Sequence, residues 1–529
     1  MTLLEEDSSR AAPGRRPGAA LLALAVAGVL STVAGAAVAS GLVSLGASVP
    51  EGVPLIRADL PATAMDEVAA PANNSPLLLQ DPTDPSFVVL ANRLDAPDFS
   101  CALQVSSDGG RTFGPAAPVV ELPPGAEKCY APEVAFDADG SLYYLFVGLA
   151  GPGNEPVGAF LTTSADGART FTAPRRVLGP LNYSVRMAID PEIGERGRLH
   201  LVWLHATSDP PLGGFGPLPN PILAAYSDDG GNSFSEPVQV NDDDHRRVLG
   251  PALAIGPDHA VHVAYYDLRD DIRDYQGLEG PVYDGTWSMV LATSTDAGKS
   301  FRPGVVVDDG LEPSTRVMLV FTMPPPALVA ARGRACVGWT DARYGDDDAL
   351  VRCSGDQGRT WGPMRRLNDD PPGNGASQYL PRLAVAPDGR IDAVYYDRRG
   401  DPSNLAASVS YTYSTDGIRF APAVALTREP SDTRIGQQYA GAAAEGLVEF
   451  GSRLALLARP RGAVAAWPDT RNSAELTTAQ DIFATEIDLR YSETDPGWGR
   501  PLGIVAVAAG LGMAGAAVRK RRAPAEAAL

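Results

Sequence analysis

Arginine and tyrosine residues recur at the starts of apolar segments along this 529-residue chain, and their side chains could bind an anion. A guanidinium group offers paired N–H donors that match a carboxylate. We interpret the recurrence as equivalent positions of a repeated unit, from which the side chains converge on one ligand. Glu133 could instead pair with one of these arginines. The candidate ligand-binding residues are Tyr130, Arg186, Arg247, Arg316, Tyr379, Arg382, Arg434 and Tyr439.

A second polar pattern, aromatic-x-Asp-x-Arg, occurs four times and ends at Arg269, Arg343, Arg399 and Arg471. A reaction centre needs one copy of its residues, so a motif present in four units indicates a structural role. We therefore expect its aspartates to pair with arginines or to cap loops. These aspartates are Asp267, Asp341, Asp397 and Asp469.

The elements that position these residues are set by a third motif, Ser-x-Asp-x-Gly-x-Ser/Thr-aromatic. It begins at Ser106, Ser164, Ser227, Ser294, Ser354 and, one residue short, Ser414. An Asp side chain can accept backbone N–H groups of its own turn, and Gly tolerates positive φ. The motif thus predicts a hairpin corner between two strands. We expect the least regular turns where Ala168 replaces the Gly and at the shortened copy.

These motifs are Asp boxes, and residues 52–492 resemble the sialidase-like superfamily of bacterial neuraminidase repeats. The resemblance implies an all-β Asp-box propeller in which the box aspartates are structural. True sialidases share an Arg-Ile-Pro sequence, an arginine triad, a Tyr–Glu nucleophile pair and an Asp acid/base. Arg-Ile-Pro is absent here, and Arg57 is followed by Ala58-Asp59, so catalytic residues remain unassigned. The box aspartates are Asp108, Asp166, Asp229, Asp296, Asp356 and Asp416.

Counting the first strand of each unit predicts seven blades, with six as the alternative. The last unit ends with a third strand near Asp481 and lacks a fourth. Because an open edge exposes unpaired backbone groups, we expect Pro54–Asp59 to close the ring as that missing strand. The predicted first strands begin near Asn74, Tyr130, Tyr183, Val248, Arg316, Tyr379 and Tyr439.

Both ends of the chain indicate a membrane. A basic segment, residues 1–17, precedes an apolar stretch, residues 18–49, that is either a signal peptide or a signal anchor. Residues 501–518 predict a transmembrane helix, and residues 519–529 a basic cytoplasmic tail. These segments place the propeller on the extracytoplasmic side of a cell membrane.

The four cysteines predict two disulfides in an exported domain, Cys336–Cys353 and Cys101–Cys129. No CxxC occurs and only five His are present, so no metal site is expected. The acidic runs at residues 242–244, 346–348 and 369–370 could hold calcium but match no EF-hand loop, and we expect no cofactor. A formal net charge of −20 argues against a nucleic-acid partner.

Three function classes follow. The first is a membrane-tethered propeller that binds a glycan or another anionic ligand where the inner strands begin. The second, implied by the resemblance, is an exo-α-sialidase-type glycoside hydrolase. The third is a non-catalytic envelope scaffold or adhesion protein.

Overall fold

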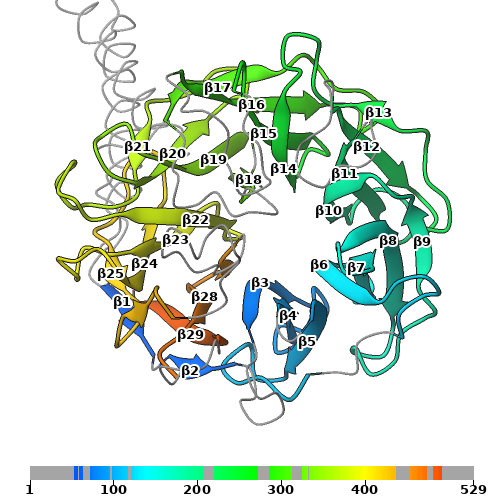
Figure 1. The fold of residues 1–529 in the computed structure, drawn as a ribbon, viewed down its shortest axis with the longest axis horizontal. Coiled ribbons are helices and arrows are strands. Elements are labelled where there is room, and N and C mark those ends of the chain that lie inside the picture. Colours follow the sequence, from blue (N-terminus) through cyan, green and yellow to red (C-terminus); the bar gives the residue numbers. More distant parts are fainter. Residues whose placement is uncertain are drawn as a thin grey trace, which may run out of the picture. The chain divides into compact units, whose positions relative to one another are not determined.

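The computed structural model describes residues 53–57, 59–62, 72–95, 98–116, 121–206, 220–271, 285–312, 324–331, 333–435, 453–472 and 480–490. Within these ranges the chain forms β-strands and turns. Seven antiparallel sheets surround a central axis (Figure 1), which confirms the seven-bladed all-β propeller and excludes six blades. No helix among the described residues is long and apolar enough to cross a membrane. The predicted segments 18–49 and 501–518 lie outside the described residues.

The strands of each blade run outward from the axis in chain order, except that blade 7 is completed at its outer edge by strands from residues 53–61. Blade 1 consists of β3 (Asn73–Gln80), β4 (Val88–Leu94) and β5 (Ser100–Ser106). Blade 2 consists of β6 (Lys128–Phe136), β7 (Leu142–Ala150), β8 (Glu155–Ser164) and β9 (Arg175–Leu178). Blade 3 consists of β10 (Asn182–Asp190), β11 (Arg198–His205), β12 (Ile222–Ser227) and β13 (Val238–Gln239). Blade 4 consists of β14 (Val248–Ile255), β15 (Val261–Asp267), β16 (Trp287–Ser294) and β17 (Val305–Leu311).

The remaining blades follow the same order. Blade 5 consists of β18 (Ala327–Ala331), β19 (Arg334–Asp341), β20 (Asp348–Ser354) and β21 (Arg365–Arg366). Blade 6 consists of β22 (Gln378–Val385), β23 (Ile391–Asp397), β24 (Ala406–Ser414) and β25 (Val424–Ala425), and β26 (Ser431–Asp432) also pairs with β24. Blade 7 consists of β27 (Ala455–Arg459), β28 (Gly462–Asp469) and β29 (Asp481–Arg490), completed by β1 (Val53–Ile56) and β2 (Leu60–Pro61).

Blade 7 is closed by the segment predicted to close it. β1 and β2 both pair with β29, the third strand of that blade. The Arg57 N–H donates to the Glu486 carbonyl at 3.1 Å, and the Ala62 N–H to the Ile482 carbonyl at 2.7 Å. Two parts of the chain far apart in sequence thus share one sheet, which satisfies the edge that β29 would otherwise expose.

Two of the predicted first strands are wrong. Blades 5 and 7 begin at Ala327 and Ala455, and not near Arg316 and Tyr439, which lie outside the described residues. In blade 7 the turn that leads into the second strand is tight, since Arg459 pairs with Gly462. Such a turn requires the first strand to lie immediately before it. In each of these blades an apolar run precedes the first strand in the sequence. Hydrophobic periodicity alone does not distinguish that run from the strand itself.

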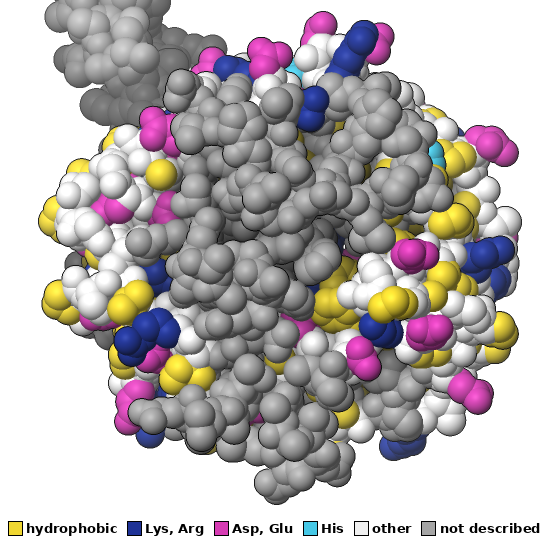
Figure 2. Space-filling model, in the orientation of Figure 1, with side chains coloured by type: hydrophobic (Ala, Val, Ile, Leu, Met, Phe, Trp, Pro, Cys, Tyr) yellow, Lys and Arg dark blue, Asp and Glu magenta, His cyan; other side chains and the backbone are white. Residues whose placement is uncertain are grey.

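The core lies between neighbouring blades. Second strands end in fully buried aromatic side chains, including Trp203, Trp339 and Trp467. The ring is sealed by the same kind of packing, since Val88 and Leu90 of blade 1 share a cluster with blade 7. On the described surface of one face, acidic and basic side chains are interspersed rather than separated by sign (Figure 2).

The Asp boxes have the expected geometry. In blade 1, the Asp108 carboxylate accepts the Thr112 N–H at 3.0 Å and the Thr112 hydroxyl at 2.7 Å. The Ser106 hydroxyl accepts the Gly110 N–H at 2.7 Å. Hydrogen bonds of this kind, led by those from the hydroxyl residue at the seventh position of each box, hold the pKa of Asp166, Asp229 and Asp356 at about 2.

The two variant boxes behave differently from each other. Ala168 adopts φ +61°, and its N–H donates to the Ser164 hydroxyl at 3.0 Å, so this turn keeps the regular geometry and the prediction for it is wrong. In the shortened copy, the Gly417 N–H bonds the Ser414 hydroxyl three residues back. There the Arg419 guanidinium replaces the missing hydroxyl and donates to Asp416 at 3.1 Å.

Both predicted disulfides are present. Cys336 and Cys353 lie directly opposite each other on β19 and β20, with Cα atoms 4.1 Å apart. Cys101 on β5 and Cys129 on β6 are 5.5 Å apart at Cα and join blade 1 to blade 2.

Two buried histidines give the propeller a predicted weakness in acid. His200 and His262 occupy corresponding second strands of blades 3 and 4 and are almost fully buried. Burial lowers the pKa of each to about 4, assisted at His200 by the nearby Arg198 charge. The unfolded chain binds these protons near pH 6.5 and the folded chain only near pH 4, so stability falls as pH drops through this window.

We expect each histidine to cost roughly 2 kcal/mol of unfolding free energy between pH 7 and pH 4.5. Urea unfolding at both pH values should show a smaller loss in His200→Gln and His262→Gln than in the unmodified chain. The Asp boxes do not contribute in this window, because their lowered pKa values confine their effect to below about pH 4. Identical pH dependence in all three proteins would contradict the prediction.

Candidate functional site

A repeated β-bulge shapes the inner wall of the propeller. The pairing of the first and second strands shifts at the same place in β3, β6, β10, β14 and β22. Each bulge contains one residue with positive φ, between 49° and 62°. A bulge bends its strand and redirects the side chain that follows it. The positive-φ residues are Ser75, Ala131, Ser184, Gly250 and Leu380.

The first paired residue after each bulge is charged in three blades. It is Glu133 in blade 2, Arg186 in blade 3 and Arg382 in blade 6. The corresponding residues in blades 1 and 4 are Leu77 and Ala252. The same local geometry therefore brings three charged side chains to one level of the inner wall.

These three side chains meet a fourth, Arg453, which lies two residues before β27. The Arg186 Nη1 donates to Glu133 Oε1 at 2.9 Å, and Arg453 Nη1 donates to the same oxygen. Side-chain exposure is only 11% for Arg186, 8% for Glu133 and 7% for Arg453. We call Glu133, Arg186, Arg382 and Arg453 the arginine cluster.

Carbonyl groups of the bulges also serve the cluster. Arg186 Nε donates to the Pro251 carbonyl at 3.1 Å. Arg453 donates to the Pro132 carbonyl at 2.6 Å and to the Ser75 carbonyl at 3.3 Å. Arg453 of blade 7 thus bonds blades 1 and 2, and Arg186 of blade 3 bonds blades 2 and 4. Both arginines therefore link blades to one another.

Arg382 is different. Its Nε is buried and has no hydrogen-bond acceptor among the described residues, and the described ion pairs do not include it. Burial lowers the pKa of Arg382 to about 10, as does repulsion from Arg453, against the attraction of Glu133. It remains protonated near neutral pH. One carboxylate faces three guanidinium groups, so the arginine cluster carries a net positive charge in an otherwise acidic protein.

Glu133 is held as a carboxylate. Burial alone would raise its pKa, but the charges of Arg453 and Arg186 outweigh burial and lower it. A carboxylate stabilised in this way is a weak proton acceptor.

The other predicted ligand residues lie elsewhere. The ring of Tyr130 packs under the Arg93 guanidinium, 4.4 Å away, and Tyr379 stacks on Tyr396 and accepts a hydrogen bond from Arg398. Arg434 is exposed and pairs with Asp432 at 2.6 Å. Arg247 lies just before β14, and no contact of its side chain with a described residue joins it to the arginine cluster.

The aromatic-x-Asp-x-Arg motif is structural, as expected. In each copy the Asp accepts the backbone N–H of the Arg two residues later, as at Asp341 and Arg343 (3.0 Å). Arg343 then bridges Asp341 at 2.5 Å and Asp308 of blade 4 at 2.8 Å. Arg471 pairs with both Asp469 and Asp59, and so fastens the closing segment.

The acidic runs converge on an arginine. Arg366 contacts Asp348 at 2.7 Å and Asp370 at 3.3 Å, so a guanidinium lies between two of the predicted runs. Among the described residues, no group of three His, Cys, Asp or Glu side chains is arranged to hold a metal ion. The expectation of no cofactor, with calcium as the weaker alternative, stays untested.

Arg453 was missed by sequence reasoning. The signal was present, since Ser452-Arg453-Leu454 immediately precedes the apolar run of β27. It was overlooked because the first strand of blade 7 was expected near Tyr439.

Comparison with known proteins adds one clear sequence relative. No family model matches the chain. A sialidase from Micromonospora viridifaciens is 26% identical over 413 residues, which cover 73% of this chain and 58% of that protein. The chain therefore spans little more than half the length of this relative.

Solved structures show weaker likeness. A protein of unknown function from Dyadobacter fermentans is 13% identical with a TM-score of 0.45, covering 83% of this chain and 99% of its own. The Hadza microbial sialidase Hz136 is 14% identical with a TM-score of 0.40, covering 77% and 74%. The chain is therefore a seven-bladed Asp-box β-propeller that is similar in sequence to a sialidase.

Proposed function

We propose that this propeller is tethered to the outer face of a cell membrane and binds a carboxylate-bearing glycan at the arginine cluster. The tether rests on the apolar segments 18–49 and 501–518 of the sequence. The proposal of a glycan ligand depends mainly on one observation. The Arg382 guanidinium has no described acceptor and lies beside two further arginines. A carboxylate is the group that a guanidinium binds with paired hydrogen bonds.

Sialic acid is the favoured carboxylate, because the sequence relative is named a sialidase. A ligand carboxylate beside Arg382 would offset the mutual repulsion of the arginines, which Glu133 alone does not balance. The entry of an anion is therefore favoured by the charges already present in the cluster.

An exo-sialidase is the second candidate, supported by the same relative. Two observations favour binding over turnover. Arg-Ile-Pro is absent from the sequence, and the lowered pKa of Glu133 makes it a poor base for activating a nucleophile.

Arg382→Met should weaken binding of sialyllactose about 10- to 100-fold, because a charge-assisted hydrogen bond is worth about 1.5–3 kcal/mol. The measurement is calorimetric titration of the full chain with sialyllactose, and with lactose as the uncharged comparison. Arg434→Met is the matched control, since Arg434 is an exposed arginine paired with Asp432, and it should bind as the unmodified chain does.

Unchanged binding in Arg382→Met would contradict the proposed site. Absence of binding to any acidic glycan would favour the envelope scaffold. Release of a fluorophore from a sialoside, abolished by Arg382→Met, would show that the protein is an enzyme.

A further inference from the structure

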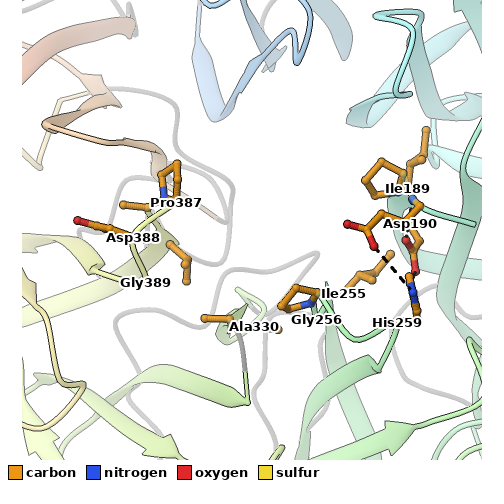
Figure 3. A pocket seen from close by; sticks show the side chains of 15 residues that line it. Ile189, Asp190, Ile255, Gly256, His259, Ala330, Pro387, Asp388 and Gly389 are labelled. Atoms are coloured by element: carbon orange, nitrogen blue, oxygen red, sulfur yellow. Dashed lines mark hydrogen bonds and ion pairs between the residues drawn. The ribbon is translucent and has the colours of Figure 1, made fainter. Parts of the chain in front are cut away.

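A cavity of about 780 Å³ opens at the opposite end of the inner strands (Figure 3). It is surrounded by the turns between the first and second strands of blades 3, 4, 5 and 6. This size suits a small organic ligand. Strand direction separates it from the arginine cluster, because that cluster lies near the starts of the inner strands and the cavity at their ends.

The surface of the cavity is about half apolar and half polar, and its charged groups are mostly acidic. Isoleucine, proline, alanine and valine side chains make up most of the lining. Asp190 and Glu192 belong to the blade 3 turn, and Asp388 lies on the opposite wall (Figure 3). His259 completes the charged groups that line it.

His259 occupies a position that favours glycine. The turns of blades 2, 4 and 6 share one geometry, in which the N–H of Gly140, His259 or Gly389 bonds a carbonyl three residues back. That residue has positive φ in all three turns, 81°, 62° and 88° respectively. Two blades use glycine, whereas blade 4 holds a histidine in a conformation that costs about 1 kcal/mol or more for a residue with a Cβ.

The strained histidine faces the cavity and pairs across blades. Its Nδ1 lies 2.9 Å from Asp190 Oδ2, and its Nε2 lies 3.9 Å from Glu192 Oε2. The hydrogen bond with Asp190 raises the pKa of His259, and the charges of Asp190, Glu192 and Asp258 act in the same direction. His259 lines a cavity while its backbone is strained, and this combination indicates that the residue has a role beyond folding.

We propose that this cavity binds a small organic cation, an ammonium or guanidinium group on a short apolar stem. The apolar side chains of the lining would cover the stem, and Glu192 and Asp388 are exposed enough to receive the charged end. His259 competes with the ligand for the carboxylates of blade 3.

Protonated His259 and a ligand cation repel each other, so affinity rises as pH rises through the pKa of His259. The charged groups that act on His259 are Asp190 and Glu192 of blade 3 and Asp258 of its own turn. The opposite wall carries Asp388, which lies 3.9 Å from the buried Arg390 of blade 6. The described part of the blade 5 turn contributes only Ala330 and Ala331.

The test is calorimetric titration of the full chain with n-hexylammonium at pH 6 and pH 8, with hexanol and hexanoate as neutral and anionic counterparts. We expect n-hexylammonium to bind best, and better at pH 8. Glu192→Gln and Asp388→Asn should each weaken it about two- to fivefold, the range for exposed charge pairs. Asp243→Asn, an exposed acidic residue outside the cavity, is the matched control. Ala330→Trp should fill the cavity and abolish binding.

The variant His259→Gly tests the contribution of the histidine separately. It restores the residue that blades 2 and 6 use, so the fold should persist, and the difference between pH 6 and pH 8 should disappear. The proposal is overturned if hexanol and hexanoate bind as tightly as n-hexylammonium, or if no probe binds. Persistent pH dependence in His259→Gly overturns the part assigned to His259.

Discussion

Replacement of Glu133 by alanine should destabilise the propeller by about 3–5 kcal/mol, because it leaves buried guanidinium groups without their counter-charge. Arg186 and Arg453 both donate to Glu133, and Arg382 is also attracted to it. Their mutual repulsion would then act across the axis without compensation. Urea unfolding of the full chain at pH 7 measures the change.

Arg382→Met is the matched control for this experiment. It removes one of three like charges and breaks no hydrogen bond to a described residue, so stability should hold or rise. The pair of variants separates the two roles of the cluster, since Glu133 is needed for stability and Arg382 for binding. Equal stability losses in the two variants would show that Arg382 is also structural.

Deletion of residues 53–62 should cost about 5 kcal/mol or more and reopen the ring at blade 7. The deletion removes β1 and β2, several backbone hydrogen bonds worth roughly 1 kcal/mol each, and the Asp59 partner of the partly buried Arg471. It also exposes one edge of β29. Thermal unfolding should show a lower midpoint and a broader transition.

Leu60→Ser is the control for the deletion, because the Leu60 side chain is largely exposed and the backbone pairing is kept. It should unfold like the unmodified chain. A deletion variant with an unchanged melting temperature would show that β1 and β2 are dispensable, and that the closure has no energetic role.

The fold could be predicted because its signals are local. Six Asp boxes at a regular spacing specify hairpin corners, and each box is satisfied within eight residues of chain, as at Ser106–Phe113. The orphan strand near Asp481 and the spare strand near Pro54 predicted how the ring closes. The disulfides followed from strand adjacency. The two wrong strand predictions also had a local cause. In blades 5 and 7 a second apolar run precedes the first strand, and the two are alike in sequence.

The candidate site could be predicted only in part. Arg186, Arg382 and Glu133 were identified because they follow apolar strand starts, but Arg434 and Tyr379 satisfied the same pattern and lie elsewhere. Sequence position shows that a residue belongs to an inner strand. It does not show which way a side chain points once a bulge has shifted the register.

The sequence by itself determined the all-β repeat, the Asp-box corners and the closing segment, because these depend on short-range hydrogen bonds and on strand periodicity. Only the tertiary structure decided which charges meet. Arg453 and Glu133 are 320 residues apart in sequence, and the Arg453 guanidinium donates a hydrogen bond to the Glu133 carboxylate. His259 and Asp190 likewise meet across two blades at the far cavity. Such pairings depend on how the ring closes and on how each bulge redirects its strand. No local sequence pattern encodes either of these.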